Sequence, residues 1–492
     1  MNCKRMKEHA VARAWRAKAL GILLTAATLA AGQEVPPNRD PATPAPPIGA
    51  AQPKNGQPEQ LPPAPRTEYY PIDLPTALRL ADGQNPEIQF ARERILAAEA
   101  ELARADILLL PNLTGGGEWL RHDGQTQRVE GPVIPVSKSS IFGGGGFHVG
   151  VAFADAYFEP LAVRQLLANR MAGARTTAND TLRNVAFFYY EMIRAKALLA
   201  TAQETFDNAQ RLDGLAQSYF RNDKLREADA ARVRAEFRTR GQDLENSRQN
   251  TMLASIRLAQ QLRLDPFVML DPVETKALPI ILVDIHASSN ELTIIALTNR
   301  PELAENQALA NFAVERLRRA TYGPLFPSVL LDYRAGVFAG GKHDFVGDAG
   351  ARGDVDAALV WELHNLGFGD YALKKQRESE VRQAQIQVVG VMDQIVAQVA
   401  DAVVRLRSLE QQVEAARQAV ASAERSYELN WKLFTIGSKD LITPLEVLQS
   451  VQALAAARAA YLNAIVDYDK AQFQLYWALG NPVEHAKPAA AK

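Results

Sequence analysis

The amino-acid sequence predicts an α+β fold that consists mainly of long α-helices and contains two copies of one structural unit. Prolines of the first half recur in the second half at an offset of 215 or 216 positions: Pro86 and Pro301, Pro111 and Pro327, Pro266 and Pro482. A constant offset across most of the chain indicates an internal repeat, because unrelated segments would not keep their spacing. Short alternating segments and long proline-free helices, described below, define what each copy contains.

The composition is that of a folded chain without a cysteine framework. Of its 492 residues, 47% are hydrophobic and 23% are charged, as in globular proteins. The formal net charge of −1 gives no support for nucleic-acid binding. Cys3 is the single cysteine, which excludes a disulfide framework and a cysteine-based metal cluster. The seven histidines are scattered and no nucleophile motif occurs, so we predict no cofactor, no metal site and no enzymatic activity.

The first 32 residues have the pattern of an export signal. A basic segment precedes the apolar stretch Ala19–Ala31, which is too short to span a bilayer as a helix. We therefore predict a signal peptide over residues 1–32, with a retained membrane anchor as the alternative. Residues 33–71 are dense in proline, glutamine and glycine and are predicted to be a linker. No later segment reaches the roughly 18 apolar residues of a membrane helix, so a membrane location after export would require a β-barrel.

Each copy contains the same elements in the same order. A helix of the first copy, Pro86–Leu110, corresponds to Pro301–Tyr322 in the second, and proline suits the first turn of a helix. A glycine-rich region of alternating residues follows, and then two very long helices joined by a short turn. This order divides the chain after the linker into a first repeat at 72–271, a connector at 272–290, a second repeat at 291–483 and a tail at 484–492.

The alternating segments predict four strands per chain. The candidates are Leu113–Leu120 and Phe147–Phe153 in the first copy, and Val329–Phe338 and Val355–Leu363 in the second. Apolar residues on one face oppose charged residues on the other, as in transmembrane strands with a lipid face and a lumen face. The polar segments His122–Ser140 and Gly340–Arg352 are predicted to be extracellular loops. Four strands cannot close a barrel alone, so this interpretation requires several copies of the chain.

The long helices carry a coiled-coil pattern. From Tyr371 to about Phe434 the chain contains no proline, and a helix of this length would extend roughly 95 Å. Large apolar residues such as Leu406 alternate at heptad positions with small ones such as Ala402, and the next helix continues this pattern. The pattern predicts antiparallel helices in close contact, with first-copy counterparts at 161–220 and 225–264.

These features together resemble the TolC-like outer-membrane efflux factors over residues 72–482. The matching stretches are the helix starts at Asn85 and Arg300, the prolines Pro111 and Pro327, the strand-to-helix segment 361–369 and the end of the chain, 461–480. The resemblance implies a homotrimer. Four strands from each chain would form one 12-stranded transmembrane β-barrel, continuous with a periplasmic α-helical coiled-coil barrel.

The resemblance also implies a location and partners. Such a protein would lie in the outer membrane, with most of its helical tunnel in the periplasm, and would bind a periplasmic adaptor protein and an inner-membrane pump. It would conduct cargo passively, as the exit duct of a tripartite efflux system or a type I secretion system, and would not be an enzyme.

The same resemblance assigns residues at the periplasmic end of the tunnel. The turns that would close this end are 221–228, with Asp223 and Lys224, and 435–444, with Gly437 and Lys439. Asp229 matches an acidic residue that begins the helix after the first turn. Glu446 takes the first of two acidic positions after the second turn, and Gln449 replaces the other. A ring of such carboxylates from several chains would attract cations. Alternatively, Asp229 and Glu446 merely complement the dipoles of their helices.

Two other functions match parts of the sequence. A periplasmic coiled-coil scaffold or adaptor protein without a membrane barrel would have loops in place of the predicted strands. An exported enzyme would need a cluster of catalytic groups, for which the sequence offers no motif. The cargo of a conduit, whether a drug, a metal or a protein, is not encoded in any motif of this chain.

Overall fold

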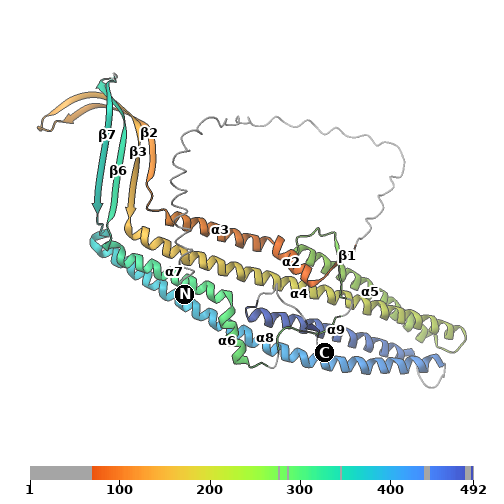
Figure 1. Ribbon diagram of the computed structural model, residues 1–492. Helices are drawn as coiled ribbons and strands as arrows, with labels where there is room; N and C mark the ends of the chain where they lie inside the picture. Colours follow the sequence, from red (N-terminus) through yellow and green to blue (C-terminus); the bar gives the residue numbers. More distant parts are fainter. Residues whose placement is uncertain are drawn as a thin grey trace, which may run out of the picture. The chain divides into compact units, whose positions relative to one another are not determined.

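Two copies of one helix-and-strand unit follow each other along the chain (Figure 1). The first comprises α2 (Leu74–Gln84), α3 (Pro86–Asp106), β2 (Asn112–Gln127), β3 (Val133–Ala152), α4 (Phe153–Arg221) and α5 (Glu227–Gln261). The second comprises α6 (Ser289–Asn299), α7 (Pro301–Tyr322), β6 (Ser328–Lys342), β7 (Gly347–Val360), α8 (Phe368–Ile436) and α9 (Pro444–Ala478). Corresponding helices match in length, since α4 and α8 have 69 residues each and α5 and α9 have 35 each. The predicted internal repeat is therefore present in the fold.

The computed structural model describes residues 69–274, 277–284, 287–343, 346–436 and 444–481, together with the backbone of 489–490. All of them belong to one unit, residues 66–492. The predicted signal peptide, the predicted linker up to residue 68 and most of the predicted tail lie outside the described residues. The last residues assigned to the linker, 69–71, belong to strand β1 (Tyr69–Ile72).

The four long strands form one antiparallel sheet in the order β2-β3-β6-β7. The central pairing joins β3 to β6, with Ala152 opposite Ser328, so that the two repeats share the sheet. The loop predicted over His122–Ser140 was wrong, because β2 and β3 stay paired up to Gln127 and Val133 and leave only residues 128–132 between them. Most of the loop predicted over Gly340–Arg352 was wrong for the same reason. Backbone pairing does not require alternating side chains, so polar strand ends escape a search for alternation.

The first long helix begins earlier than its sequence indicates. β3 ends at Ala152 and α4 begins at the next residue, Phe153, so that Pro160 lies inside the helix. The predicted start, at about Leu161, lies one residue after this proline. A proline interrupts one backbone hydrogen bond, and the packing of the rest of a 69-residue helix compensates for that loss.

Short strand pairs connect the ends of the repeats. β1 pairs in parallel with β4 (Met269–Pro272), which follows α5. β5 (Ile280–Ile281), in the connector, pairs in antiparallel with β8 (Ala489–Ala490) near the end of the chain. The connector is thus fixed to both ends of the folded unit.

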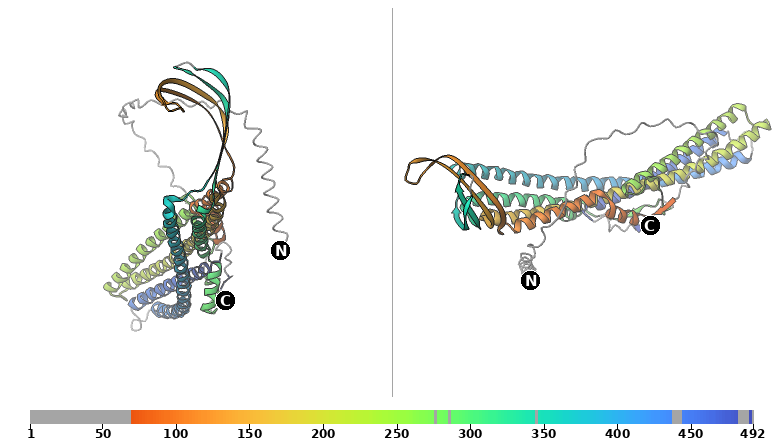
Figure 2. Two further views of the ribbon diagram at one scale, coloured as in Figure 1. Left: turned by 90° about the vertical axis from the view of Figure 1, so that its left-hand side faces the viewer. Right: turned by 90° about the horizontal axis from the view of Figure 1, so that it is seen from above.

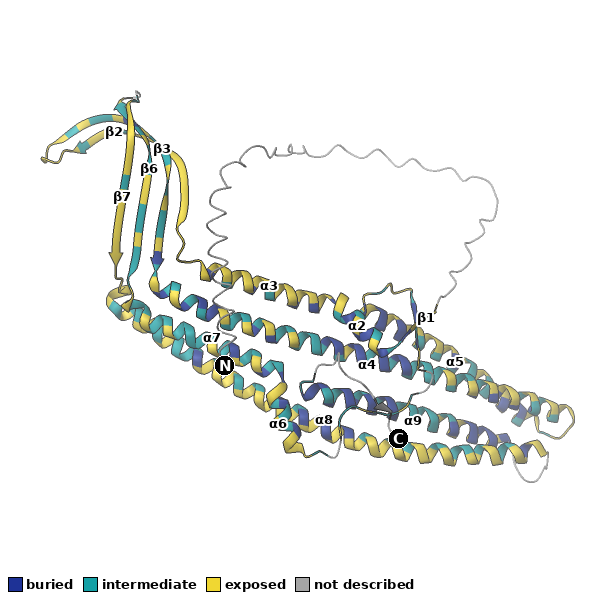
Figure 3. Cartoon of the chain, in the orientation of Figure 1, coloured by how far each residue is buried: buried dark blue, intermediate teal, exposed yellow. Residues whose placement is uncertain are grey.

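The main core lies where the short helices pack against the middle of the long ones (Figure 3). Leu182 and Tyr189 of α4, Leu406 of α8 and Phe473 of α9 are each at most 1% exposed. Leu406 is one of the predicted heptad residues, and most of those of α9 are buried as well, which confirms the predicted helix pairing there. A second, smaller core joins the far ends of the two helix pairs.

One helical segment, His364–Ile436, is long and apolar enough to cross a membrane by length and composition alone, with a mean hydropathy of 1.3 in its most apolar window. The expectation that no segment after the export signal would be apolar enough to cross a membrane was wrong. Aspartates and glutamines interrupt the apolar residues of this segment in the sequence, although the apolar residues lie along one stripe of the helix. Only 22% of that window is buried within the chain. The segment packs along α7 and α9 as part of the helical bundle, and its apolar surface needs another covering.

Candidate pore surface and helix tips

The four-stranded sheet separates apolar from charged side chains. In this register, odd-numbered residues of all four strands share one face, where the rings of Phe147 and Tyr333 lie 5.3 Å apart between centroids. This apolar face carries Leu113, Trp119, Phe147, Val149, Leu331, Tyr333, Val337, Val355 and Leu359. The charged face carries Glu118, Lys138, His148, Asp332, Arg334, Arg352, Asp354 and Asp356. The predicted division into two faces is present in both repeats, with exceptions: Arg121 and Asp123 lie on the apolar face, and Leu120, Phe142, Leu330 and Phe338 lie on the charged face.

Ion pairs cross the charged face. The Nδ1 atom of His148 and the Nε atom of Arg334 each lie 3.3 Å from Asp332, and Arg352 lies 2.9 Å from Asp354. The guanidinium of Arg352 also lies 5.1 Å from the ring centre of Phe338. The charged face thus carries paired charges of both signs, which are favourable next to water. The apolar face is favourable away from water.

The sheet is curved (Figure 2), and its glycines indicate which of its faces is concave. Side chains on the concave face of a sheet converge, so the most crowded positions there must be glycine. A Cβ atom on Gly144, Gly146 or Gly336 would overlap the backbone of the neighbouring strand, and all three point to the charged face. On the apolar face, a Cβ atom on Gly143 would meet nothing within 4 Å and one on Gly145 would lie 3.3 Å from the carbonyl oxygen of Thr114, so neither would overlap the backbone as those three do. The charged face is therefore concave. The run Gly143–Gly146 lies in the middle of β3.

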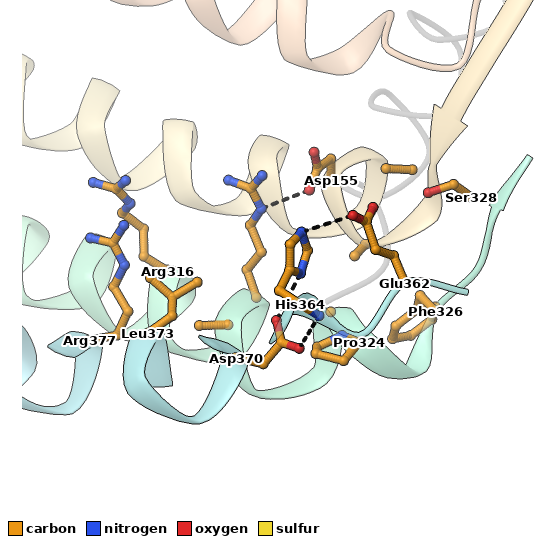
Figure 4. Close-up of a pocket in the computed structure, with 15 residues that line it drawn as sticks. Asp155, Arg316, Pro324, Phe326, Ser328, Glu362, His364, Asp370, Leu373 and Arg377 are labelled. Atoms are coloured by element: carbon orange, nitrogen blue, oxygen red, sulfur yellow. Dashed lines mark hydrogen bonds and ion pairs between the residues drawn. The ribbon is translucent and has the colours of Figure 1, made fainter. Parts of the chain in front are cut away.

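A pocket of about 480 Å³ lies where the strands join the helices (Figure 4). Arg316 and Arg319 of α7, Arg377 of α8, Asp155 of α4 and the segment around His364 line it. Arg319 donates to Asp155 at 2.7 Å, while His364 lies 3.0 Å from Asp370 and 3.5 Å from Glu362. Ala152 and Ser328, on the charged face of the sheet, also line the pocket. The charged surface of the sheet therefore continues onto the helices.

The described residues contain no group of histidine, cysteine, aspartate and glutamate side chains that could hold a metal ion. Among the described residues, the charged face and the pocket therefore present polar and charged side chains without a metal centre. Three arginines and three carboxylates line the pocket, so their formal charges balance.

The turn between α4 and α5 contains Asp223 and Lys224, which are both exposed. The N–H groups of Asp223 and Lys224 donate to the carbonyls of Phe220 and Tyr219 at 3.0 and 2.9 Å, which caps the end of α4. Asp223 has a φ of 53° in this cap, where glycine is the usual residue. Aspartate tolerates this left-handed conformation better than most residues do, so the cap forms without glycine.

Asp229 lies in the first turn of α5, and its side chain is only 14% exposed. The guanidiniums of Arg226 and Arg232 approach its carboxylate at 2.9 and 3.7 Å. Its charge is thus balanced by its own helix end, which matches the helix-dipole alternative.

Glu446 and Gln449 are exposed and three positions apart in the first turns of α9, so they share one face of this helix. The residues between them, Val447 and Leu448, are buried in the smaller core. Gly437 and Lys439 lie outside the described residues. Glu446 and Gln449 therefore lie together on the exposed side of α9, and the opposite side of this helix packs in the smaller core.

The smaller core brings the two helix ends together. Leu212 of α4, Val233 of α5, Phe434 of α8 and Val447 of α9 pack in one cluster. The hydroxyl of Tyr219 donates to the carbonyl of Phe434 at 3.4 Å. The residues predicted at the two turns therefore lie at the same end of the helical bundle.

A charged bridge between helices had no signal in the sequence. Arg458 of α9 contacts Glu204 of α4 at 2.5 Å and Glu424 of α8 at 2.8 Å, and Gln452 of α9 donates to Glu236 of α5 at 2.7 Å. These residues look like ordinary surface charges in the sequence, because their partners come from distant segments. The bridge fixes α9 against its neighbours between the tips and the main core.

Two stretches that carry the family resemblance meet in the folded chain. The buried Arg300 pairs with Glu302 at 2.7 Å and stacks on Trp477, with 4.1 Å between the guanidinium and the ring centre. Arg183 stacks on the same ring at 4.2 Å. Gly480 has a φ of 76°, and a Cβ atom there would lie 2.7 Å from the backbone nitrogen of Arg300. The start of α7 and the end of α9 thus form one contact within this fold.

Comparisons with known proteins agree with this geometry. Residues 294–481 match the family model described as outer membrane efflux protein. A comparison of the sequence with curated proteins found no match.

Solved structures match most of the chain. The outer membrane protein VceC from Vibrio cholerae has a TM-score of 0.68 and 17% identity, over 83% of this chain and 96% of its own. The Campylobacter jejuni CmeC outer membrane channel has a TM-score of 0.71 and 15% identity, over 83% and 85%. The Neisseria gonorrhoeae MtrE outer membrane channel has a TM-score of 0.66 and 15% identity, over 83% and 89%. Residues 294–481 therefore resemble the outer membrane efflux protein family, and the chain as a whole has the fold of these solved structures.

Proposed function

We propose that this chain is the outer-membrane exit duct of a tripartite efflux or type I secretion system. Three copies would close a 12-stranded β-barrel in the outer membrane and a helical tunnel in the periplasm. The observation that carries the proposal is the curved sheet, whose concave face is charged and whose convex face is apolar. Closing such a sheet on itself places charged residues around water and apolar residues against lipid.

The edges of the sheet support closure by several chains. β2 and β7 are the outer strands, with 16 and 14 residues, and each has one edge without a partner among the described residues. Long unpaired edges expose backbone donors and acceptors, which a neighbouring strand would satisfy. Pairing of β7 with β2 of the next copy, repeated three times, would leave no free edge.

The helices support the same assembly. Ile386, Val389 and Val404 of α8 are 70%, 56% and 67% exposed. Such a stripe of apolar side chains on a long helix requires a partner, and a neighbouring chain would bury it. The apolar segment of α8 would then lie between chains of the tunnel rather than across a membrane.

Glu446 and Gln449 would face the periplasmic entrance, where three copies of each form a ring. Asp229, Asp223 and Lys224 would lie near the same entrance, with Gly437 and Lys439 in the second turn. The expected partners are a periplasmic adaptor protein and an inner-membrane pump, which supplies the energy. The duct itself would carry out no chemical step, in keeping with a family model that describes efflux.

The first test is the native mass of the full-length protein extracted in detergent from purified outer membranes. We expect a trimer. A monomer, or a protein found only in the soluble periplasm, would contradict the duct and favour a periplasmic scaffold.

Two neighbouring leucines of β6 provide a matched test of the two faces. Leu331 lies on the apolar face and Leu330 on the charged face. We expect Leu331→Asp to reduce trimer formation in the outer membrane strongly, because a carboxylate on the lipid face destabilises each of the three chains, although by less than the roughly 2–4 kcal/mol of an arginine or lysine at the bilayer midplane. Leu330→Asp should assemble at close to the normal level. Equal assembly of both variants would show that neither face meets lipid.

A further inference from the structure

The segment from the end of β7 into the first turn of α8, residues 361–371, exposes large apolar side chains at the base of the sheet. We call this segment the junction loop. Its exposed residues are Trp361 at 58%, Leu363 at 64%, Leu366 at 89%, Phe368 at 77% and Tyr371 at 62%. Exposure of this extent in a run of eleven positions needs a covering other than water.

The junction loop continues both faces of the sheet. Val355 and Leu359 belong to the apolar face, and Trp361 and Leu363 follow at the same two-residue period. Leu363 has an extended backbone, with a φ of −110° and a ψ of 104°. Glu362 and His364, at the alternate positions, line the charged pocket in Figure 4. Trp361 and Leu363 therefore project on the side of the apolar face.

The backbone of the loop is held in a conformation that presents Leu366. Asn365, Leu366 and Gly367 all have positive φ values, of 52°, 61° and 88°. A left-handed conformation costs roughly 1–2 kcal/mol for each residue other than glycine, and a leucine gains nothing from it locally. Asp370 fixes the turn, because its carboxylate accepts the N–H of His364 at 3.0 Å and lies 3.0 Å from the Nδ1 atom of the same residue. Gly369 packs against this turn without room for a side chain.

We propose that the junction loop binds the phospholipid leaflet on the helix side of the sheet, with Leu366 and Phe368 inserted at the boundary between headgroups and acyl chains. Trp361 and Tyr371 would lie at headgroup level, where aromatic side chains with a polar group are favoured. Lys374 follows on α8 with a charge suited to lipid phosphates, whereas Lys375 pairs with Glu378 at 3.0 Å. This inference rests on the proposed outer-membrane duct, and it assigns to one loop the role of fixing the depth of the sheet in the membrane.

A second copy of the chain is the competing occupant of this surface. A neighbouring chain that pairs with β7 would approach the edge of the strand. Side chains of an extended segment stand perpendicular to the sheet, so Trp361 and Leu363 project from its face and not from its edge. The geometry therefore favours lipid.

The test uses the full-length trimer in vesicles of phosphatidylethanolamine and phosphatidylglycerol. In a Cys3→Ser background, Leu366→Cys is labelled with an environment-sensitive fluorophore, and Lys224→Cys in the turn between α4 and α5 is the exposed control. Quenching by nitroxide-labelled lipid is compared with quenching by aqueous iodide. We expect the label at Leu366→Cys to be quenched several-fold more by lipid than the control and to be protected from iodide.

Each other outcome overturns the proposal in a distinguishable way. Quenching of both labels by iodide alone would place the loop in water. Protection of Leu366→Cys from both quenchers would place it against a neighbouring chain. The native mass and the channel conductance of the labelled sample are measured in parallel. Either of these two results in a conducting trimer leaves the duct intact, whereas a sample without trimers contradicts the duct and the lipid contact together.

Discussion

Asp469 of α9 is the most unusual charged residue of the main core. It is 2% exposed, and its carboxylate accepts the N–H of Ile280 in the connector at 2.9 Å. Burial raises the pKa of Asp469 to about 8, with that hydrogen bond acting in the opposite direction. Three positions later, Gln472 accepts the N–H groups of Leu282 and Val283 at 3.2 and 3.1 Å. Side chains on one face of α9 thus bind backbone N–H groups of the connector.

The raised pKa of Asp469 predicts that stability falls as pH rises. Between the ordinary pKa of 3.8 and a pKa of about 8, the folded chain keeps a proton that the unfolded chain releases. The free energy of unfolding should therefore fall by up to about 1.4 kcal/mol per pH unit over this range and level off above it. Asp469→Asn keeps an acceptor for Ile280 without a titrating group, so its Tm in detergent should depend less on pH and be higher near pH 8.

The matched control for this prediction is Asp467→Asn. Asp467 lies two positions away on α9, and its side chain is 47% exposed beside Arg194. We expect this variant to keep the pH dependence of the unmodified protein. An unchanged slope in Asp469→Asn would mean that Asp469 does not hold a proton in the folded chain.

At the scale of elements, the curvature of the sheet depends on particular glycines of the run Gly143–Gly146. The sequence alone does not show which of them matter. Gly143 and Gly144 are neighbours in β3, but only a Cβ atom on Gly144 would overlap β6. The curvature of the sheet is therefore built into alternate positions of the run.

Gly144→Ala should prevent the sheet from curving enough to close, because the overlap with the backbone of β6 can only be relieved by separating the strands. We expect a strong loss of trimer in the outer membrane, measured by native mass and by heat resistance of the oligomer. Gly143→Ala is the matched control and should assemble normally. Equal assembly of the two variants would contradict a curvature set by the concave-face glycines.

At the scale of the whole molecule, the proposed ring at the entrance has one acidic member per chain. Three copies of Glu446 around a narrow opening would concentrate negative potential there and favour cations. Gln449 lies on the same face of α9, where a carboxylate would strengthen this potential.

Glu446→Gln should reduce the cation preference of the channel in planar bilayers and weaken its block by divalent cations several-fold, whereas Gln449→Asp should strengthen both. Glu291→Gln is the control, because Glu291 is an exposed acid in the first turn of α6, away from the tips, and its substitution removes the same helix-dipole interaction. An effect of equal size in Glu446→Gln and Glu291→Gln would indicate that Glu446 acts only on its helix.

Much of the architecture could be predicted from the sequence. The proline offsets gave the repeat, the heptads around Leu406 gave the paired helices, and the alternation in Val329–Phe338 gave the two faces of β6. The candidate residues at the tips, Glu446 and Gln449, were identified by resemblance, and their place on one exposed face of α9 follows from their spacing. These signals are local, because the periodicity of a helix or strand depends only on which face of that one element is buried.

The tertiary structure alone decided which distant residues meet. The burial of Asp469 against the connector, the stacking of Arg300 and Arg183 on Trp477, and the bridge from Arg458 to Glu204 join segments more than a hundred positions apart. The extension of β2 and β3 through polar residues and the left-handed turn at Leu366 depend on neighbouring backbone as well. Charge, hydrogen bonding and backbone strain are set by partners, and partners far along the chain leave no period in the sequence.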